Sequence, residues 1–344
     1  MALHHPRGMG VILGFHCSHE QHPPSALLRY AQLAAEAGFT AGMCSDHFHP
    51  WSERQGHSGF AWSWLGSALQ ATPLSFGTVC APGQRYHPAV IAQAGATLAE
   101  MYPERFWLAL GSGEALNETI TGSAWPSKPE RGARLEQAAD VIRALWAGQT
   151  VSTRGHVTTS HAKLYSRPNR PPLLVGAALT PGTARWVASW ADGLITASGP
   201  RDAMRAVVEA FREGGGDNKP MFLQVALSFG ATAEESRRAA YDQWRQSALS
   251  GEQLADLHTP IEFDQATDDA EPLDVWSKVR VSPEIGRQLD WLYEDCALGF
   301  ERIYLHNLVR EHQERFIEAC GTRLIPAIAK AAGGRTARAQ QVGA

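Results

Sequence analysis

The segment GFTAGMCSDHFHPW, residues 38–51, joins a short apolar run to a polar cluster. The apolar run at 38–43 predicts a buried strand. After it come an aspartate, two histidines and a tryptophan, which supply a charge, two groups that titrate near neutral pH and a large flat surface. The cluster fits either a site at a strand end or a His-rich turn that caps the next helix. Other predicted strands also end in polar clusters, which favours the site.

The same succession of an apolar run and an amphipathic segment repeats along the chain. Predicted strands cover residues 11–15, 38–43, 74–80, 105–110, 173–178, 193–197, 221–229 and 302–305, and predicted helices cover 24–37, 61–71, 88–101, 131–146, 180–191, 202–211, 284–298 and 312–331. Eight strand–helix pairs without a GxGxxG motif after the first strand predict an α/β fold of the (β/α)8 TIM-barrel type rather than a doubly wound sheet. The polar clusters follow strands, which is where such barrels carry their active sites.

Two segments interrupt this alternation. Residues of about 150–166 alternate polar and β-branched side chains around Arg154-Gly155, which predicts a hairpin insertion after strand four. Residues of about 231–282 are mostly polar and helical, and are too long for a simple connection after strand seven. We expect this second insertion to cover the site. We also expect a single domain over residues 1–332, followed by a disordered tail at 333–344.

Composition restricts the function classes. The formal charge of −4 argues against a nucleic-acid or membrane-surface partner. The five cysteines form no CxxC pair, and their odd number fits reduced thiols in a cytoplasm. The N-terminal residues contain no apolar h-region, so we expect no signal peptide, and no apolar run approaches the ~18 residues of a membrane span. The sequence therefore predicts a cytoplasmic protein that acts on a small molecule.

The histidines at strand ends raise the alternative of a metal hydrolase. A barrel metal site would need His-x-His after strand one and further ligands after strands five and six. This chain has His-x-x-His at His16 and His19, and the later strand ends read Gly-Ala-Ala and Thr-Ala-Ser. We therefore predict no metal ligand. No Gly-x-Ser-x-Gly elbow supplies a serine nucleophile, and Cys44 and Cys80 fit buried structural thiols.

Two other strand ends suit a flat, phosphate-bearing ligand. Ser112 and Glu114 lie among two glycines that let the backbone approach such a ligand. The structural alternative is a helix start with an acid in its first turn. Residues 175–181 form a small-residue exit onto a helix N-terminus, which can present N–H groups to a phosphate. These features predict a flavin-like cofactor across the barrel mouth.

Three pieces of the chain carry a family resemblance: SDHFHPW at 45–51, RYHPAVIAQA at 85–94 and GEALNE at 113–118. They resemble the deazaflavin-dependent glucose-6-phosphate dehydrogenases of the bacterial luciferase-like oxidoreductases, and the likeness covers nearly the whole chain. The chain also looks like a neighbouring subgroup that uses an ordinary flavin. The resemblance implies a (β/α)8 barrel, a homodimer and either FMN or the deazaflavin coenzyme F420.

The resemblance also implies a role for each matching residue. His47 matches the catalytic imidazole and Glu114 the acid that protonates the ring, while Glu20 and Trp51 match a carboxylate and an aromatic on the substrate side. Thr78-Val79 falls where the family has a non-proline cis peptide, so a cis bond is predicted there. The residues expected at the cofactor are Asp46, Thr78, Val79, Ser112, Gly113, Asn117, Ala177, Ala178, Leu179 and Thr180.

Three departures from the family pattern bear on the substrate and the cofactor. Where the family has a phosphate-binding Lys after strand six, this chain reads Ser-Gly-Pro-Arg at 198–201. The second phosphate Lys aligns only loosely with Lys278, although Arg280 stands nearby. A family Gly-Gly pair is replaced by Leu179-Thr180. With Phe48, Trp51, Trp62 and Trp64 expected to line the pocket, a less polar alcohol, aldehyde or ketone is predicted.

The sequence leaves three hypotheses for the function. In the first, His47 accepts a proton from a substrate alcohol while hydride moves to the ring and Glu114 supplies a proton at the ring nitrogen. In the second, an FMN-dependent monooxygenase uses the same histidine in a step with oxygen. In the third, the barrel binds a flavin or another planar ligand without catalysis.

Overall fold

The eight predicted strands form a closed parallel barrel in the computed structural model, which describes residues 10–331. They are β1 (Ile12–His16), β2 (Ala41–Ser45), β3 (Ser75–Cys80), β4 (Phe106–Leu110), β7 (Leu173–Ala177), β8 (Gly193–Ala197), β9 (Met221–Ser228) and β11 (Arg302–Asn307). Each strand pairs with the next in the chain, β9 pairs with β11, and β11 pairs with β1. The predicted (β/α)8 barrel is confirmed.

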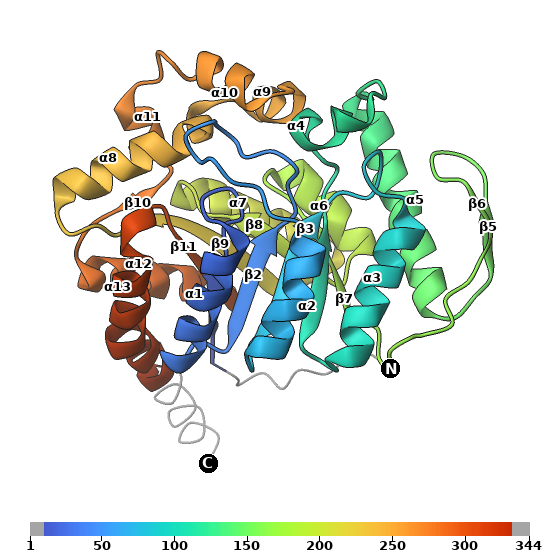
Figure 1. Cartoon of the computed structure of the whole chain (residues 1–344), viewed down its shortest axis with the longest axis horizontal. Helices are drawn as coiled ribbons and strands as arrows, with labels where there is room; N and C mark the ends of the chain where they lie inside the picture. Colours follow the sequence, from blue (N-terminus) through green and yellow to red (C-terminus); the bar gives the residue numbers. More distant parts are fainter. Residues whose placement is uncertain (1–9, 332–344) are drawn as a thin grey trace.

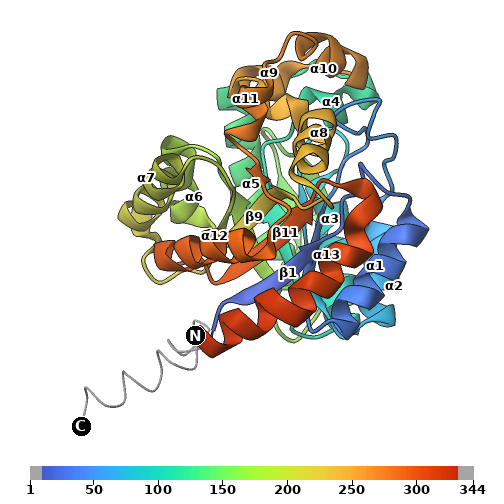
Figure 2. The same cartoon turned by 90° about the vertical axis from the view of Figure 1, so that its left-hand side faces the viewer.

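Helices surround the barrel on the outside (Figures 1 and 2). They are α1 (Pro24–Glu36), α2 (Ala61–Ala71), α3 (Pro88–Met101), α5 (Lys128–Trp146), α6 (Pro181–Trp190), α7 (Arg201–Phe211), α12 (Ile285–Leu298) and α13 (Gln313–Ala319), the last continuing through a wider turn at Cys320–Leu324. Several begin with proline, whose fixed φ suits the first helical turn. The strand predicted at 38–43 begins three residues later and covers Ala41–Ser45, because Gly38 adopts a positive φ of 97° at the end of α1.

Aromatic rings fill the barrel interior, and small apolar residues cover them at the carboxyl end of the barrel. Trp107 packs against Phe222 and Tyr304, and its indole N–H donates to the Tyr304 hydroxyl at 3.0 Å. Gly77 is required beside this group, since a Cβ there would lie 1.8 Å from the Trp107 ring. Val79 and Ala177 pack on the same cluster and are partly exposed. The interior is therefore a packed core with a smooth, apolar upper layer.

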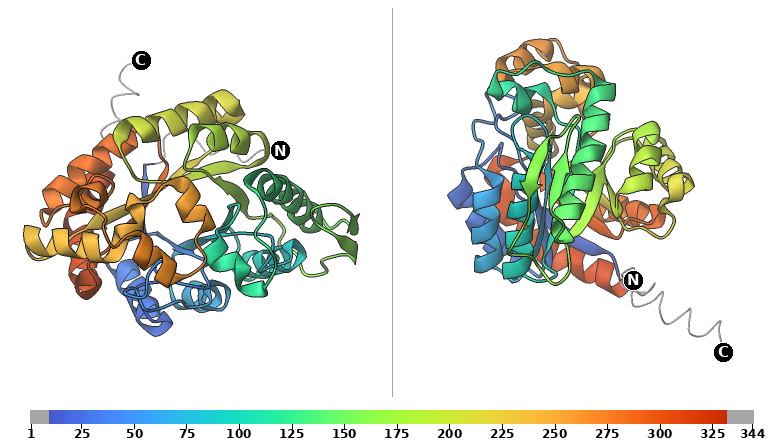
Figure 3. Two further views of the ribbon diagram at one scale, coloured as in Figure 1. Left: turned by 90° about the horizontal axis from the view of Figure 1, so that it is seen from above. Right: turned by 90° about the vertical axis from the view of Figure 1, so that its right-hand side faces the viewer.

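Both insertions occur where they were predicted. After β4 come α4 (Ala115–Glu118), a short turn at Thr119–Thr121, α5, and a hairpin of β5 (Val151–Thr153) and β6 (Thr159–Ala162). After β9 come α8 (Ala233–Trp244), a turn at Arg245–Ala248, α9 (Gly251–Asp256), α10 (Pro260–Ala266), α11 (Pro272–Trp276) and the unpredicted strand β10 (Arg280–Val281). Figures 1 and 3 show α8 to α11 lying over the carboxyl end of the barrel. The tail predicted at 333–344 lies outside the described residues.

The peptide bond between Thr78 and Val79 is trans, because no cis bond occurs within residues 10–331. The predicted cis bond is therefore wrong for this structure. Strand β3 keeps an unbroken register with both neighbours here, Thr78 opposite Cys44 and Leu108, and Val79 opposite Ser45 and Ala109. An unbroken ladder satisfies the backbone hydrogen bonds at this point with an ordinary extended chain.

Candidate active site

His47 and Glu20 meet at the carboxyl end of the barrel. His47 follows β2 and Glu20 follows β1, and the distance between His47 Nδ1 and Glu20 Oε1 is 2.9 Å. Ser18 donates from its hydroxyl to the other Glu20 oxygen at 2.8 Å. Both side chains are largely shielded, with 12% of His47 and 5% of Glu20 exposed. The structure therefore brings together the predicted imidazole and the predicted first-strand carboxylate.

Burial and charge act in opposite directions on this pair. Burial lowers the pKa of His47, but the Glu20 carboxylate outweighs it, so the pKa of His47 is raised above its ordinary value of 6.5. For Glu20, burial raises the pKa, yet the neighbouring imidazole brings the pKa well below its usual range. Glu20 is thus charged near neutral pH, and His47 can take up and hold a proton there.

Trp51 forms a wall beside the imidazole. Its ring meets the His47 ring edge to face, with centroids 5.2 Å apart. On its other side it meets Phe263 of α10 at 5.3 Å. The indole is therefore held between His47 and the roof of the barrel mouth, which is formed by the helices α8 to α11 of the insertion after β9.

Asp46, just after the end of β2, points away from the side on which its neighbour His47 lies. Successive residues of an extended chain point in opposite directions, so Asp46 faces α2 and has no exposed side-chain surface. Its carboxylate accepts from Trp62 Nε1 at 3.2 Å and from the Tyr86 hydroxyl at 3.3 Å, and lies 3.3 Å from Arg85. Burial raises the pKa of Asp46, and Arg85 only partly offsets it.

The expectation that Trp62 and Trp64 line the pocket is wrong. Both are buried in the layer between the barrel and its helices, with 9% and 5% exposure. Trp62 binds Asp46, and the indole N–H of Trp64 donates to the Pro24 carbonyl. Of the four predicted aromatic residues, Trp51 and Phe48 remain accessible.

The loop after β4 is joined to the loop after β2 by Asn117. Its side-chain oxygen accepts from the backbone N–H groups of Phe48 at 2.8 Å and His49 at 3.2 Å. Its amide nitrogen donates to Glu114 at 3.3 Å. Gly113 has a positive φ of 80°, and a Cβ there would lie 3.0 Å from Glu118. Glu114 stays partly exposed and Ser112 exposed, so both can face a ligand.

Arg85 and Glu118 form a buried ion pair beside the candidate site, and the sequence did not single them out. Glu118 accepts from the backbone N–H groups of Gln84 at 3.2 Å and Arg85 at 2.9 Å, and its carboxylate lies 3.6 Å from the Arg85 guanidinium. Arg85 also pairs with Asp46, so one buried cation holds two strand-end loops. Burial raises the pKa of Glu118. Both residues lie within the family motifs, but spacing alone gives no sign of their pairing.

The remaining predicted cofactor residues surround the upper layer of the barrel. Thr78 is fully buried and binds Cys44, whereas Val79 and Ala177 face the mouth. Ala178 is buried, while Leu179 and Thr180 are exposed. The Thr180 hydroxyl caps α6 by accepting from the N–H of Thr183 at 3.3 Å. A floor of small apolar residues beside a capped, exposed helix start fits a planar ring with a phosphate tail.

Three other histidines near the strand ends, His16, His19 and His306, are buried. His16 and His306 stack with ring centroids 4.5 Å apart, and His306 binds Gln21 at 2.6 Å. Burial lowers the pKa of His16 and of His19 to about 4. Within residues 10–331, no three His, Cys, Asp or Glu side chains are grouped as metal ligands would be.

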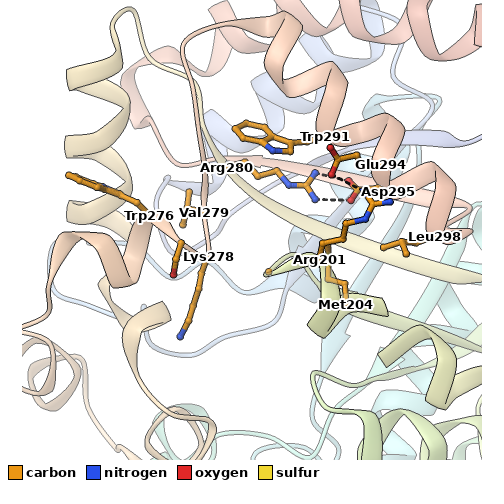
Figure 4. Close-up of a pocket in the computed structure, with 12 residues that line it drawn as sticks. Arg201, Met204, Trp276, Lys278, Val279, Arg280, Trp291, Glu294, Asp295 and Leu298 are labelled. Carbon is orange, nitrogen blue, oxygen red and sulfur yellow. Dashed lines mark hydrogen bonds and ion pairs between the residues drawn. The ribbon is translucent and has the colours of Figure 1, made fainter. Parts of the chain in front are cut away.

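A separate cavity of about 210 Å³ holds the cations that were considered for a sugar phosphate (Figure 4). Arg280 makes a two-pronged ion pair with Asp295 at 2.6 and 2.7 Å. Arg201, the first residue of α7, pairs with Glu294 at 2.8 Å. Lys278 donates to the Ser247 carbonyl at 2.5 Å. Both arginines are thus already neutralised by carboxylates.

Comparison with known proteins assigns the family. The family model for luciferase-like monooxygenases matches residues 9–281 of this chain. The chain belongs to the luciferase-like monooxygenase family. As a member of that family it is similar to F420-dependent glucose-6-phosphate dehydrogenases, at 35% identity to that of Nakamurella multipartita and 33% to that of Mycolicibacterium smegmatis. The alignments cover 92% and 93% of this chain and 96% and 98% of those proteins.

A solved structure of another F420-dependent enzyme is also similar to this chain. An F420-dependent secondary alcohol dehydrogenase in complex with an F420–acetone adduct is 26% identical, with a TM-score of 0.86 over 93% of this chain and 99% of that one. The findings confirm the predicted family and the prediction of an oxidoreductase of the flavin or deazaflavin class. No described helix is long and apolar enough to cross a membrane.

Proposed function

We propose that this enzyme exchanges hydride between the deazaflavin coenzyme F420 and a small, unphosphorylated alcohol or its carbonyl partner. The observation that carries the proposal is the His47–Glu20 pair, set beside Trp51 at the mouth of the barrel. The names of the relatives support the cofactor. Titrating purified protein separately with F420 and FMN tests it: tight binding of FMN alone would contradict the proposal.

The residues at the mouth fit the cofactor in the following way. Val79 and Ala177 would lie under the ring, Ser112 and Gly113 would approach it with backbone, and Leu179 and Thr180 would lie at the phosphate end. Asp46, Thr78 and Ala178 are buried, so they would support the site from behind rather than by side-chain contact. When bound, the deazaflavin supplies a carbon that accepts or returns hydride.

The side chains at the mouth would accept and donate the protons of the reaction. Nδ1 of His47 faces Glu20, which leaves Nε2 to accept the proton of the alcohol. Glu20 stabilises the imidazolium that results, and Trp51 restricts how the alcohol lies against the imidazole. Glu114 is held by Asn117 and is the carboxyl group placed to hold a proton for the cofactor side.

The pH dependence of alcohol oxidation should report His47. Because the base must be neutral, kcat/KM should rise with pH through a midpoint above 6.5, the direction in which Glu20 shifts this pKa. Glu20→Gln removes the neighbouring negative charge, so the midpoint should move to lower pH. Steady-state rates across a pH series measure this. A midpoint that stays in place or moves upward in Glu20→Gln would show that Glu20 does not set the pKa.

Glucose 6-phosphate should be a poor substrate. A phosphate dianion needs fixed, available cations, whereas Arg201 and Arg280 are paired with Glu294 and Asp295. Pro200, at the family's lysine position, carries no charge. Steady-state assays with both cofactors should show far higher kcat/KM for 2-propanol than for the sugar phosphate. Saturable oxidation of the sugar phosphate that is lost in Lys278→Ala would overturn this.

We also propose a cytoplasmic homodimer with one barrel domain over residues 1–332. The four buried cysteines, Cys17, Cys44, Cys80 and Cys320, form no disulfide, which suits a reducing compartment. The homodimer rests on the family resemblance. Sedimentation of the purified protein at several concentrations tests the dimer.

A further inference from the structure

The loop that carries Trp51 is tied to the roof by a buried glutamine. The backbone N–H of Trp51 donates to Gln55 Oε1 at 2.9 Å. The amide nitrogen of Gln55 donates to the backbone carbonyl of Gln243, on α8, at 3.0 Å. Gln55 is fully buried. Its amide therefore links the substrate-side loop directly to the insertion after β9.

The link continues through side chains into the barrel. Gln243 Oε1 accepts from the Gln21 amide at 2.9 Å, and Gln21 Oε1 contacts Nε2 of His306 at 2.6 Å. Gln21, Gln243 and His306 are all at most 5% exposed. Buried polar groups that lose a partner are costly, so this chain of bonds fixes α8 relative to the ends of β1 and β11.

The position of Trp51 depends on these contacts. Its ring lies between His47 and Phe263, a residue of the same insertion. Arg54, in the same loop, pairs with Asp264 of α10 at 2.6 Å. The loop is therefore held to the insertion at its backbone, at its aromatic ring and at one charge.

We propose that Gln55 is a positioning residue, which together with Gln243 and Gln21 uses the roof to hold Trp51 against His47 and so sets the fit of the substrate. The inference rests on the proposed function, because it takes Trp51 as a wall of the substrate site. The glutamines act through Trp51 and not on the reacting atoms. Their loss should weaken substrate fit more than it affects cofactor binding.

The test compares Gln55→Leu with the wild-type enzyme, using 2-propanol and coenzyme F420. Because small misplacements of positioning groups can cost up to about 100-fold, we expect the KM for 2-propanol to rise about 10- to 100-fold. The Kd for the cofactor should stay within about twofold, since the bonds lost join Gln55 to Trp51 and Gln243, neither of which is assigned to the cofactor. The Trp51 amide should lose its protection in hydrogen exchange.

Gln313→Leu is the matched control. Gln313 is 3% exposed and also makes two bonds to backbone carbonyls, those of Asn307 at 2.8 Å and Val309 at 2.9 Å. Its loss should lower thermal stability to a similar extent while the KM and the protection of the Trp51 amide stay unchanged. If Gln55→Leu does not fold, Gln243→Met takes its place, and a rise in KM in the same direction is expected.

The outcomes separate this inference from the proposed function. An unchanged KM in Gln55→Leu, or an equal rise in Gln313→Leu, would overturn the positioning role. No turnover of 2-propanol by the wild-type enzyme would instead remove the proposed substrate class. The exchange measurement would then still decide the positioning: loss of protection in Gln55→Leu alone supports it, and retained protection overturns it.

Discussion

Replacing His47 by alanine should lower turnover by about 100- to 10,000-fold, the usual contribution of a general base. The cofactor should bind with nearly unchanged affinity, because the upper layer of the barrel and the loop at 112–117 remain in place. The His47 imidazole is the group at the mouth that pairs with the Glu20 carboxylate. Single-turnover reduction of bound F420 by 2-propanol, together with cofactor titration, measures both quantities.

His49→Ala is the control for this change. His49 lies in the same loop, but its ring contacts the Leu116 carbonyl at 2.8 Å instead of the carboxylate. We expect its rate to fall much less than that of His47→Ala. Equal losses of rate and of cofactor affinity in His47→Ala would make His47 a structural residue of the turn, as in the simpler interpretation of the sequence.

The sequence was sufficient for the fold because each strand–helix pair is a local pattern. Helices at 61–71 and 88–101 have the predicted bounds, since their apolar periodicity and their ends are local features. The strand at 38–43 was placed too early, because its apolar run includes the turn at Gly38. That error matters at the site, since the true strand end fixes which of Asp46 and His47 faces the mouth.

The parts of the site that the sequence could not show are pairings over long distances along the chain. Gln55 and Gln243 lie 188 positions apart, and their bond depends on how the insertion folds over the mouth. Trp62 was expected to line the pocket, yet its position on α2 directs its indole toward buried Asp46. Whether an aromatic side chain lines a pocket or a core is decided by the direction of its element, which composition does not reveal.

Arg85→Met should destabilise the fold by about 3–5 kcal/mol, the usual cost of removing one partner from a buried ion pair. Arg85 is 7% exposed, and its partners Asp46 and Glu118 are 0% and 1% exposed. The variant would leave two carboxylates buried without a cation. Denaturant unfolding at neutral pH measures the loss. Arg143→Met is the control, because its pair with Asp192 is more than a third exposed on the Arg143 side, and such pairs contribute about 0–1 kcal/mol.

The stability of Arg85→Met should also depend on pH in a direction that identifies the cause. Burial already raises the pKa of Asp46 and Glu118 above their ordinary values of 3.8 and 4.5, and removing the guanidinium raises both further. The folded state then binds more protons than the unfolded state, so stability falls as pH rises from the ordinary carboxyl range through the raised pKa values. Adding Glu118→Gln should restore part of the loss at neutral pH and flatten this dependence. If the loss is the same at every pH and Glu118→Gln restores none of it, the buried charges are not its cause, and lost packing of the arginine side chain is.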